Sequence, residues 1–221
     1  TWPISAAHTP SMRRQMFPLP PSIRPLNRAD TMSIIKRSKV MVRDICFHIV
    51  DLVQNAVAAG ARTVTVRLSD SADSDEIKLS VEDDGRGMDA DALAKARDPF
   101  YTSKGFKKVG LGLPLLEATS CACHGDFELA SQPGSGTSVR ARMEKSHWDC
   151  PPLGDLSDTM LELLVTLDEV NLEFSFHGDR GQFDISSAQV REQAGSLHLS
   201  HPDIYSFLRD YFAANLRPLL E

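Results

Sequence analysis

The sequence predicts an α/β protein, a two-layer α/β sandwich with helices on one face of a mixed β-sheet. Two observations support this prediction. Along residues 41–145 the apolar spacing changes between helical and strand periods, in the order helix, strand, strand, helix, loop, helix, strand, strand. Each segment is apolar on one face only, so one layer of helices on one sheet buries every apolar face. A small α+β C-terminal unit is expected to follow as residues 156–221.

The first helix is predicted over Ile45–Ala61, and Gly60 suits its end because glycine adopts positive φ without a Cβ clash. Its apolar residues recur at helical spacing and are expected to face the core: Ile45, Ile49, Leu52, Val53 and Ala56. A polar stripe follows another side at intervals of three or four residues: Asp44, His48, Asp51 and Asn55. By itself, this pattern is that of an amphipathic helix with a solvated polar face.

Two strands are predicted next, Thr63–Leu68 and Glu76–Asp83, with a polar turn over Ser69–Asp75 between them. In the second strand Asp83 falls on the same side as the alternating apolar residues. A lone carboxylate on that side is costly unless it is hydrogen-bonded or bound to a ligand. Asp83 is therefore a candidate ligand-binding residue.

Two glycine pairs follow. In the run DDGRGM, Gly85 and Gly87 allow a sharp turn and the close approach of a ligand. Gly110 and Gly112 stand directly before a helix. A glycine-rich turn at a helix N-terminus presents free backbone N–H groups, which suit phosphate.

Three further elements complete the domain over residues 41–145. A short helix is predicted over Asp89–Arg97, with Asp89 as its N-cap. Two alternating strands, Asp126–Ser131 and Thr137–Met143, are joined by the glycine-rich turn QPGSG.

Residues 146–155 are interpreted as a proline-containing linker to the C-terminal unit. In that unit we expect a helix over Leu156–Leu167, two short strands around the turn HGDRG, and a last helix with Ser200 as N-cap. A unit of this size is marginally stable alone, so we expect it to dock on the first domain or on a partner.

The composition is that of an ordinary globular protein, with 42% hydrophobic and 24% charged residues. No apolar run reaches the length of a membrane span, so a cytoplasmic location is expected. Residues 1–40 form a basic, proline-rich arm that is expected to be extended or disordered, and organellar targeting by it stays open. The rest of the chain is acidic, which disfavours nucleic-acid binding.

Four cysteines do not form a dense disulfide framework, so a reducing compartment is the default: Cys46, Cys121, Cys123 and Cys150. The run Cys121-x-Cys123-His124 raises the possibility of a metal. Residues two apart on a helix point to different faces, however, so small buried hydrophobes are the favoured interpretation.

The motifs occur in a fixed order: Asp51-x-x-x-Asn55, Asp83-x-Gly85-x-Gly87, PFYTSK, Gly110-Leu111-Gly112-Leu113 and Gly134-x-Gly136-Thr137. This order resembles the ATP-binding domain of the GHKL superfamily, which includes DNA gyrase, heat-shock chaperones, histidine kinases and mismatch-repair ATPases. The resemblance covers about residues 41–145 and implies ATP and Mg²⁺ as ligands. The C-terminal unit faintly resembles stand-alone ATP-binding proteins associated with iron-only hydrogenases, which implies a redox enzyme as partner.

The resemblance implies a role for each matching residue. Asn55 matches the asparagine that binds Mg²⁺ between the phosphates, and an amide oxygen suits this hard cation. Asp83 matches the aspartate that accepts a hydrogen bond from the adenine amino group, and Lys104 could reach a phosphate as a point charge. The other residues implied at the nucleotide are Gly85, Gly87, Met88, Thr102, Gly110, Leu111, Gly112, Leu113 and Thr137.

Some positions depart from the family pattern. Asp51 stands where ATP-hydrolysing members usually carry Glu as general base, and Asp is one methylene shorter. Lys104 lies close to Gly110, so any lid over ATP is short, which argues against trapping by closure. His48 is interpreted as a polar neighbour of the nucleotide or a solvated residue rather than a phosphoacceptor.

Three functions follow from the resemblance. The first is a nucleotide-dependent regulatory or assembly module with slow, Mg²⁺-dependent ATP hydrolysis. The second is a histidine-kinase-like phosphotransferase that acts on a partner protein in trans. The third is a non-catalytic interaction protein with structural ATP. In each of them a protein partner is expected to bind through the C-terminal unit.

Overall fold

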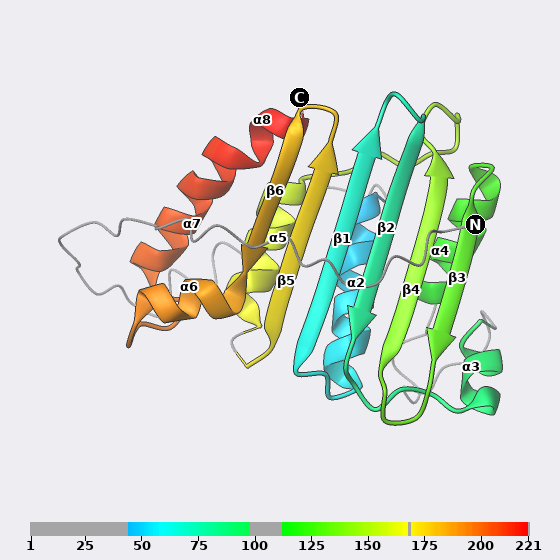
Figure 1. The fold of residues 1–221 in the computed structure, drawn as a ribbon, viewed down its shortest axis with the longest axis horizontal. Helices are drawn as coiled ribbons and strands as arrows, with labels where there is room; N and C mark the ends of the chain where they lie inside the picture. The colour runs from blue at the N-terminus through cyan, green and yellow to red at the C-terminus, as the bar shows by residue number, and fades with distance from the viewer. Residues whose placement is uncertain (1–43, 98–111, 168, 221) are drawn as a thin grey trace.

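The computed structural model describes residues 44–97, 112–167 and 169–220 (Figure 1). Its strands are β1 (Thr63–Ser71), β2 (Glu76–Asp83), β3 (Asp126–Ser131), β4 (Thr137–Glu144), β5 (Asn171–Gly178) and β6 (Gly181–Ser186). Its helices are α2 (Ile45–Ala58), α3 (Ala90–Ala96), α4 (Gly112–Ala122), α5 (Leu156–Thr166), α6 (Ser187–Ala194), α7 (Pro202–Asn215) and α8 (Arg217–Leu220).

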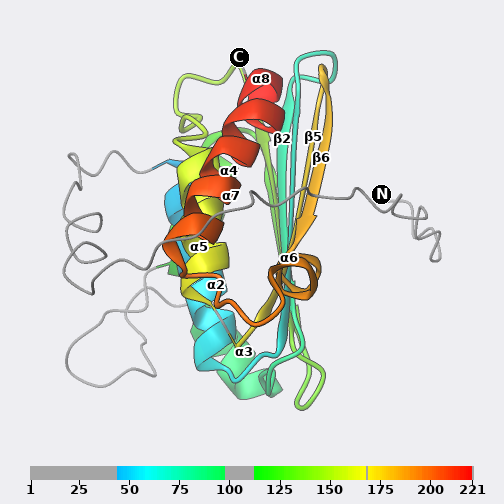
Figure 2. The ribbon, with the colours of Figure 1, turned by 90° about the vertical axis from the view of Figure 1, so that its left-hand side faces the viewer.

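All six strands belong to one mixed sheet in the order β3-β4-β2-β1-β5-β6. Helices α2, α4, α5 and α7 lie together along one face of it (Figure 2). The buried apolar residues of the strands and of these helices form one core between the two layers. The predicted two-layer α/β sandwich is therefore confirmed. Among the described helices, none combines the length and the apolar composition that a membrane crossing requires.

The C-terminal unit continues the sheet of the first domain. Strand β5 runs parallel to β1, with Val64 beside Leu172 and Val66 beside Phe174. Strand β6 pairs antiparallel with β5. Helix α5 packs beside α2 in the helical layer. The expected docking of residues 156–221 thus takes the form of strand pairing along β1 together with helix packing.

Three local predictions differ from the structure. The turn predicted over Ser69–Asp75 is shorter, because Ser69, Asp70 and Ser71 still pair with β2. Backbone ladders do not require apolar side chains, so alternation ends before the strand does. The last helix begins one residue later than predicted, with His201 rather than Ser200 as its N-cap. Helix α6 was not predicted, since its sequence SAQVREQA has no strong apolar period.

Candidate functional site

Helix α2 presents Asp51 and Asn55 on consecutive turns. Asn55 Nδ2 donates a hydrogen bond of 2.9 Å to Asp51 Oδ2. The bond holds the amide by its nitrogen, so Oδ1 is the atom that Asn55 would offer to a cation. The N-cap of the helix is Asp44, whose side chain accepts a hydrogen bond from the Phe47 N–H over 2.8 Å. The polar stripe therefore combines an N-cap with a fixed pair of polar side chains.

His48 does not share the exposure that was expected of this stripe. Its side chain is only 2% exposed, and its ring meets the Phe47 ring edge-on. The prediction of a solvated His48 is wrong, because His48 is among the buried residues of α2, a helix against which α4 and α5 both pack. Helical spacing shows which residues share a side, but the neighbouring helices decide how much of that side stays in water.

The start of α4 lies against Asp51. A Cβ added to Gly112, the first residue of α4, would come within 1.6 Å of Asp51 Oδ2. A side chain at residue 112 would displace the carboxylate, so glycine is required for this contact. The first turn of a helix carries backbone N–H groups without intrahelical partners and a positive dipole end, both of which favour anions. The fold thus brings Gly112, the described glycine of the second box, against the α2 pair.

Asp83 lies at the end of β2, half-buried on the covered side of the sheet. Its Oδ1 accepts a hydrogen bond of 2.8 Å from the Gly85 N–H, and its backbone pairs with that of Thr137. Burial raises the pKa of this carboxyl group, with a smaller contribution from Asp84, while N–H groups of Gly85 and Thr137 act in the opposite direction. Asp83 is thus an acceptor held by backbone groups.

The loop after Asp83 is fixed on one side by the connection from α2 to β1. Asp84 Oδ1 accepts hydrogen bonds from the N–H groups of Arg62 at 2.7 Å and Thr63 at 2.9 Å. These bonds hold the pKa of Asp84 below its usual value. The Arg86 N–H donates to the Ala59 carbonyl over 3.0 Å. The anchoring role of Asp84 was not predicted, although its place in the DDG run could have suggested a turn-stabilising carboxylate.

The turn between β3 and β4 fixes the same loop from its other side. Gly87 has φ +62°, and a Cβ there would lie 1.9 Å from the Gln132 carbonyl oxygen. Gly136 has φ +80°, and a Cβ there would lie 1.8 Å from the Asp83 carbonyl oxygen. Both glycines are therefore required by the contact between two backbone segments. In the described structure this loop packing, rather than an open space for a ligand, explains Gly87.

Ser131 is a second residue that the sequence did not indicate. Its Oγ accepts a hydrogen bond of 2.8 Å from the Met88 N–H and donates one of 2.8 Å to the Gly136 carbonyl. It also lies 3.0 Å from Thr137 Oγ1. A serine at the end of a strand gives no signal of such a role, since its partner Met88 is distant in the sequence.

Several predicted site residues lie outside the described residues: Thr102, Lys104, Gly110 and Leu111. The predicted short lid between Lys104 and Gly110 lies there too. Of the remaining predicted residues, Met88 and Leu113 are half-buried, and Gly85 is buried beside Ala59. The structure therefore brings together the α2 pair, Gly112, Asp83 and the two loops that hold it.

Residues 43–147 match the family model described as "Histidine kinase-, DNA gyrase B-, and HSP90-like ATPase". The signal transduction histidine-protein kinase AtoS of Escherichia coli is 34% identical over 109 residues, 48% of this chain and 17% of AtoS. The sensor protein kinase FleS of Pseudomonas aeruginosa is 38% identical over 89 residues, 40% of this chain and 22% of FleS. Full-length ShkA in complex with AMPPNP is 26% identical, with a TM-score of 0.36, over 44% of this chain and 20% of ShkA.

The matches cover less than a quarter of AtoS, FleS or ShkA. The family model ends at residue 147. These comparisons give no support to the resemblance of the C-terminal unit to hydrogenase-associated proteins, so an iron-only hydrogenase as partner stays a prediction.

Proposed function

We propose that this chain, whose residues 43–147 form a GHKL domain of the histidine kinase-, DNA gyrase B- and HSP90-like ATPase type, is a nucleotide-dependent regulatory or assembly module. One observation carries the proposal. Helix α2 touches the start of α4 at Asp51, and its C-cap Ala59 touches the loop after Asp83, with Asn55 midway between Asp51 and Ala59. At 1.5 Å per residue these contacts are about 12 Å apart along the helix. An extended nucleotide has a comparable span between its base and its phosphates.

Asp83, Asn55 and Gly112 each have a proposed role in binding Mg²⁺-ATP. Asp83 accepts a hydrogen bond from the adenine amino group, and Asn55 offers its amide oxygen to Mg²⁺. The amides of the second glycine box, which includes Gly112, bind the phosphates. The residues present fit the nucleotide, because a half-buried carboxylate, an oriented amide and a helix start occur in that order. Mg²⁺, when bound, neutralises phosphate charge.

The test is thermal unfolding of the full chain with and without Mg²⁺-ATP. Asp83→Asn should lose most of the ATP-dependent rise in melting temperature, because the amide no longer offers two acceptor oxygens. Without ATP the same variant should be at least as stable as the wild type at pH 7, since a buried charge is removed. Glu82→Gln is the matched control, as Glu82 is the adjacent carboxylate on the opposite face of β2. If Asp83→Asn kept the full ATP-dependent rise in melting temperature, the adenine would not bind at Asp83.

A second proposal is slow ATP hydrolysis with Asp51 as the general base. It is supported by the position of Asp51 Oδ2, which lies against the first turn of α4, the proposed phosphate side. Asp51→Asn should lower phosphate release by about 100-fold with little change in ATP affinity, because the amide cannot accept a proton from water. Unchanged turnover would leave Asp51 only the role of orienting Asn55.

Phosphotransfer to a partner in trans is the alternative, and the kinase names of the relatives support it. Incubation with ATP labelled on the γ-phosphate, with and without cell lysate, distinguishes the two activities. Acid-labile label on a protein would favour phosphotransfer, and label found only in inorganic phosphate would favour hydrolysis. ATP that binds without either outcome would favour the non-catalytic interaction protein.

The protein partner is proposed to bind the C-terminal unit and the linker before it. Trp148 in the linker is 99% exposed, so its indole offers apolar area that a partner can bury. A pull-down with full-length bait in ATP and in ADP should show a partner whose recovery depends on the nucleotide. Trp148→Ala should reduce that recovery without changing the ATP-dependent thermal shift.

A further inference from the structure

Three polar side chains lie side by side on the covered face of the sheet. Asp83 on β2 pairs in register with Thr137 on β4, and Thr137 pairs in register with Ser131 on β3. Residues that are directly opposite on neighbouring strands point to the same face, so all three side chains lie on the covered face. On the other side of Asp83 the row continues with Val64 of β1, which is fully buried, whereas the three polar residues are half-buried. Asp83, Thr137 and Ser131 therefore form a polar row that a ligand can reach.

The hydroxyl protons of this polar row can be assigned by counting donors. Ser131 Oγ carries one proton and donates it over 2.8 Å to the Gly136 carbonyl, an oxygen that can only accept. The Met88 N–H donates to the same Oγ over 2.8 Å. In the contact of 3.0 Å between Ser131 Oγ and Thr137 Oγ1, the donor is therefore Thr137. Ser131 Oγ then donates one hydrogen bond and accepts two, which is the full capacity of a hydroxyl group.

This assignment fixes what Thr137 can offer to a ligand. Because its proton is directed at Ser131, Thr137 Oγ1 can only accept a hydrogen bond from any other group. The ionised carboxylate of Asp83 on the neighbouring strand also only accepts. Facing Cβ atoms on paired strands are about 5 Å apart, so the two acceptors can both approach one amino group of a ligand. A carbonyl oxygen in the same place would leave both acceptors without a donor.

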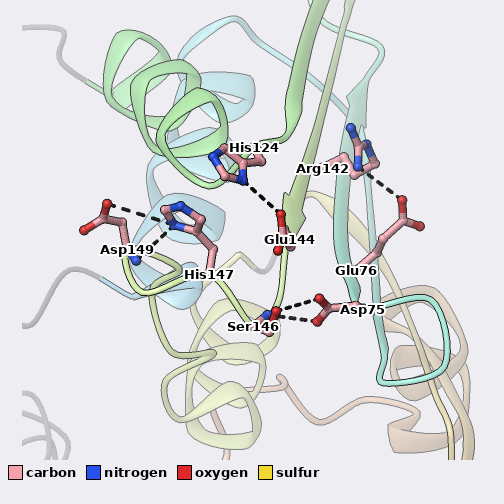
Figure 3. A network of polar contacts seen from close by, with 8 residues as sticks. All are labelled: Asp75, Glu76, His124, Arg142, Glu144, Ser146, His147 and Asp149. Carbon is pink, nitrogen blue, oxygen red and sulfur yellow. Dashed lines mark hydrogen bonds and ion pairs between the residues drawn. The ribbon is translucent and has the colours of Figure 1, made fainter.

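The three strands that carry the polar row are also tied together at their other ends. Arg142 of β4 forms ion pairs with Glu76 of β2, at 3.3 Å, and with Asp126 of β3. Figure 3 shows Arg142 directed at Glu76, and beside them the Ser146 N–H, which donates to Asp75 Oδ1 over 2.9 Å. Together with the backbone ladders, these contacts fix the register of the strands. The spacing within the polar row is therefore set by the sheet before any ligand binds.

We propose that Ser131 is a specificity-determining positioning residue, which holds the Thr137 proton and so makes Thr137 Oγ1 a second acceptor beside Asp83. The site then selects nucleotides whose base carries an amino group at this place over nucleotides that carry a carbonyl oxygen there. Ser131 acts through Thr137 and makes no contact with the base. This inference rests on the nucleotide site proposed above.

The test compares ATP with inosine triphosphate. The base of inosine triphosphate has a carbonyl oxygen in place of the 6-amino group and a proton on the neighbouring ring nitrogen, while the sugar and the phosphates are the same. Titration calorimetry of the full chain in Mg²⁺ measures the ratio of the two affinities. The wild type should bind ATP about tenfold more tightly than inosine triphosphate.

Ser131→Ala frees the Thr137 hydroxyl to donate to the carbonyl oxygen of inosine. The preference for ATP should therefore fall about fivefold, because inosine triphosphate gains affinity relative to ATP. Ser131→Thr keeps a hydroxyl at this position and should keep the wild-type preference. Ser138→Ala is the matched control, since Ser138 is the next residue of β4 and lies on the opposite face of the sheet.

A second variant tests the route through Thr137 and does not depend on the folding of Ser131→Ala. Thr137→Val removes the hydroxyl at nearly constant shape and should lower the preference for ATP by a similar factor. Adding Ser131→Ala to Thr137→Val should lower it no further, because residues that act through one contact are not additive. A further loss of preference in the double variant would contradict the route through Thr137.

The outcomes separate this inference from the nucleotide site on which it rests. A wild type that binds neither nucleotide would overturn both. A wild type that prefers ATP, together with an unchanged preference in Ser131→Ala and Thr137→Val, would overturn the role of Ser131 alone. Equal weakening of both nucleotides in Ser131→Ala would also overturn it, because it would show that Ser131 only supports the packing of the loop.

Discussion

Two adjacent carboxylates of β2 lie on opposite faces of the sheet and have opposite surroundings. Glu82 lies on the outer face, the face opposite α2, where Arg67 at 2.9 Å and Arg140 at 3.2 Å bind it. Burial acts to raise the pKa of Glu82, but the bonds from the two arginines outweigh it, so the pKa is lowered. Asp83 lies on the covered face with backbone N–H groups as partners, and burial raises its pKa.

The same contrast holds between the outer face of the sheet and the surroundings of Asp83 on the covered face. On the outer face Arg142 bridges Glu76 at 3.3 Å and Asp126, and Lys78 pairs with Glu76. Cations there balance the carboxylates, so this face is suited to solvent. At the proposed nucleotide site, Asp83 is held in place by backbone groups and keeps its capacity to accept a ligand hydrogen bond. The partners of a carboxylate, rather than its exposure alone, therefore distinguish a structural acid from a candidate binding acid.

The largest effect is expected from a change in the packing that holds Asp83. Gly136→Ala should lower the free energy of unfolding by about 3 kcal/mol, because it combines a strained positive φ with a clash against the Asp83 carbonyl. Gly134→Ala is the control: Gly134 has φ +75°, but nothing lies within 4 Å of an added Cβ, so only about 1 kcal/mol is expected. Urea unfolding measures both. Equal losses of unfolding free energy in the two variants would show that the contact between Gly136 and the Asp83 carbonyl is loose.

A second test addresses the amide on α2. Asn55→Ala should weaken ATP binding by about tenfold in Mg²⁺ and by much less in EDTA, because only the cation ligand is removed. Gln54→Ala, at the exposed neighbouring position of α2, should leave both affinities unchanged. Titration calorimetry with and without Mg²⁺ measures the difference. An equal loss in EDTA would assign Asn55 a role in the fold instead.

The smallest effect is expected on the outer face. Arg142→Ala should cost about 0.5–1 kcal/mol at pH 7 and low salt, since these ion pairs are partly exposed. The pKa values of Glu76 and Asp126 are lowered in the folded state, by Lys78 and Arg142 respectively. Their contribution is therefore present above the unfolded-state pKa and is lost as the pH falls through the folded-state pKa.

Urea unfolding of Arg142→Ala at pH 7 and pH 3 should thus show the cost shrinking in acid. Arg180→Ala, at an exposed position in the turn between β5 and β6, serves as the control and should have little effect at either pH. A cost of Arg142→Ala that is equally large at pH 3 would mean that Arg142 acts through packing rather than through charge.

The sequence predicted helices and strands well where the spacing of apolar residues is regular and glycine, proline or aspartate bounds the segment. The bounds of β2 and β3 and the N-cap Asp89 agree with the structure. What could not be predicted depends on contacts between distant segments. Alternation identifies β5 as a strand but not β1 as its neighbour, and helical spacing does not reveal that His48 is buried.

The site shows the same division. Motif order indicated Asp51, Asn55, Asp83 and Gly112, and the structure places these residues around α2 as described above. Asp84 and Ser131 were missed, because their hydrogen bonds reach residues more than 20 and more than 40 positions away. Gly87 was expected to allow a sharp turn and the close approach of a ligand, and the structure accounts for the turn through the close packing of this loop against the turn between β3 and β4.

The central claim, that Asp83 recognises the adenine amino group, is tested most directly by comparing the affinities for Mg²⁺-ATP and Mg²⁺-GTP. GTP carries a carbonyl oxygen where ATP carries the amino group, so it would direct an acceptor at the Asp83 carboxylate. We expect the wild type and Glu82→Gln to prefer ATP by about 10- to 100-fold, and Asp83→Asn to lose that preference. Equal affinity of the wild type for the two nucleotides, or an unchanged preference in Asp83→Asn, would contradict the claim.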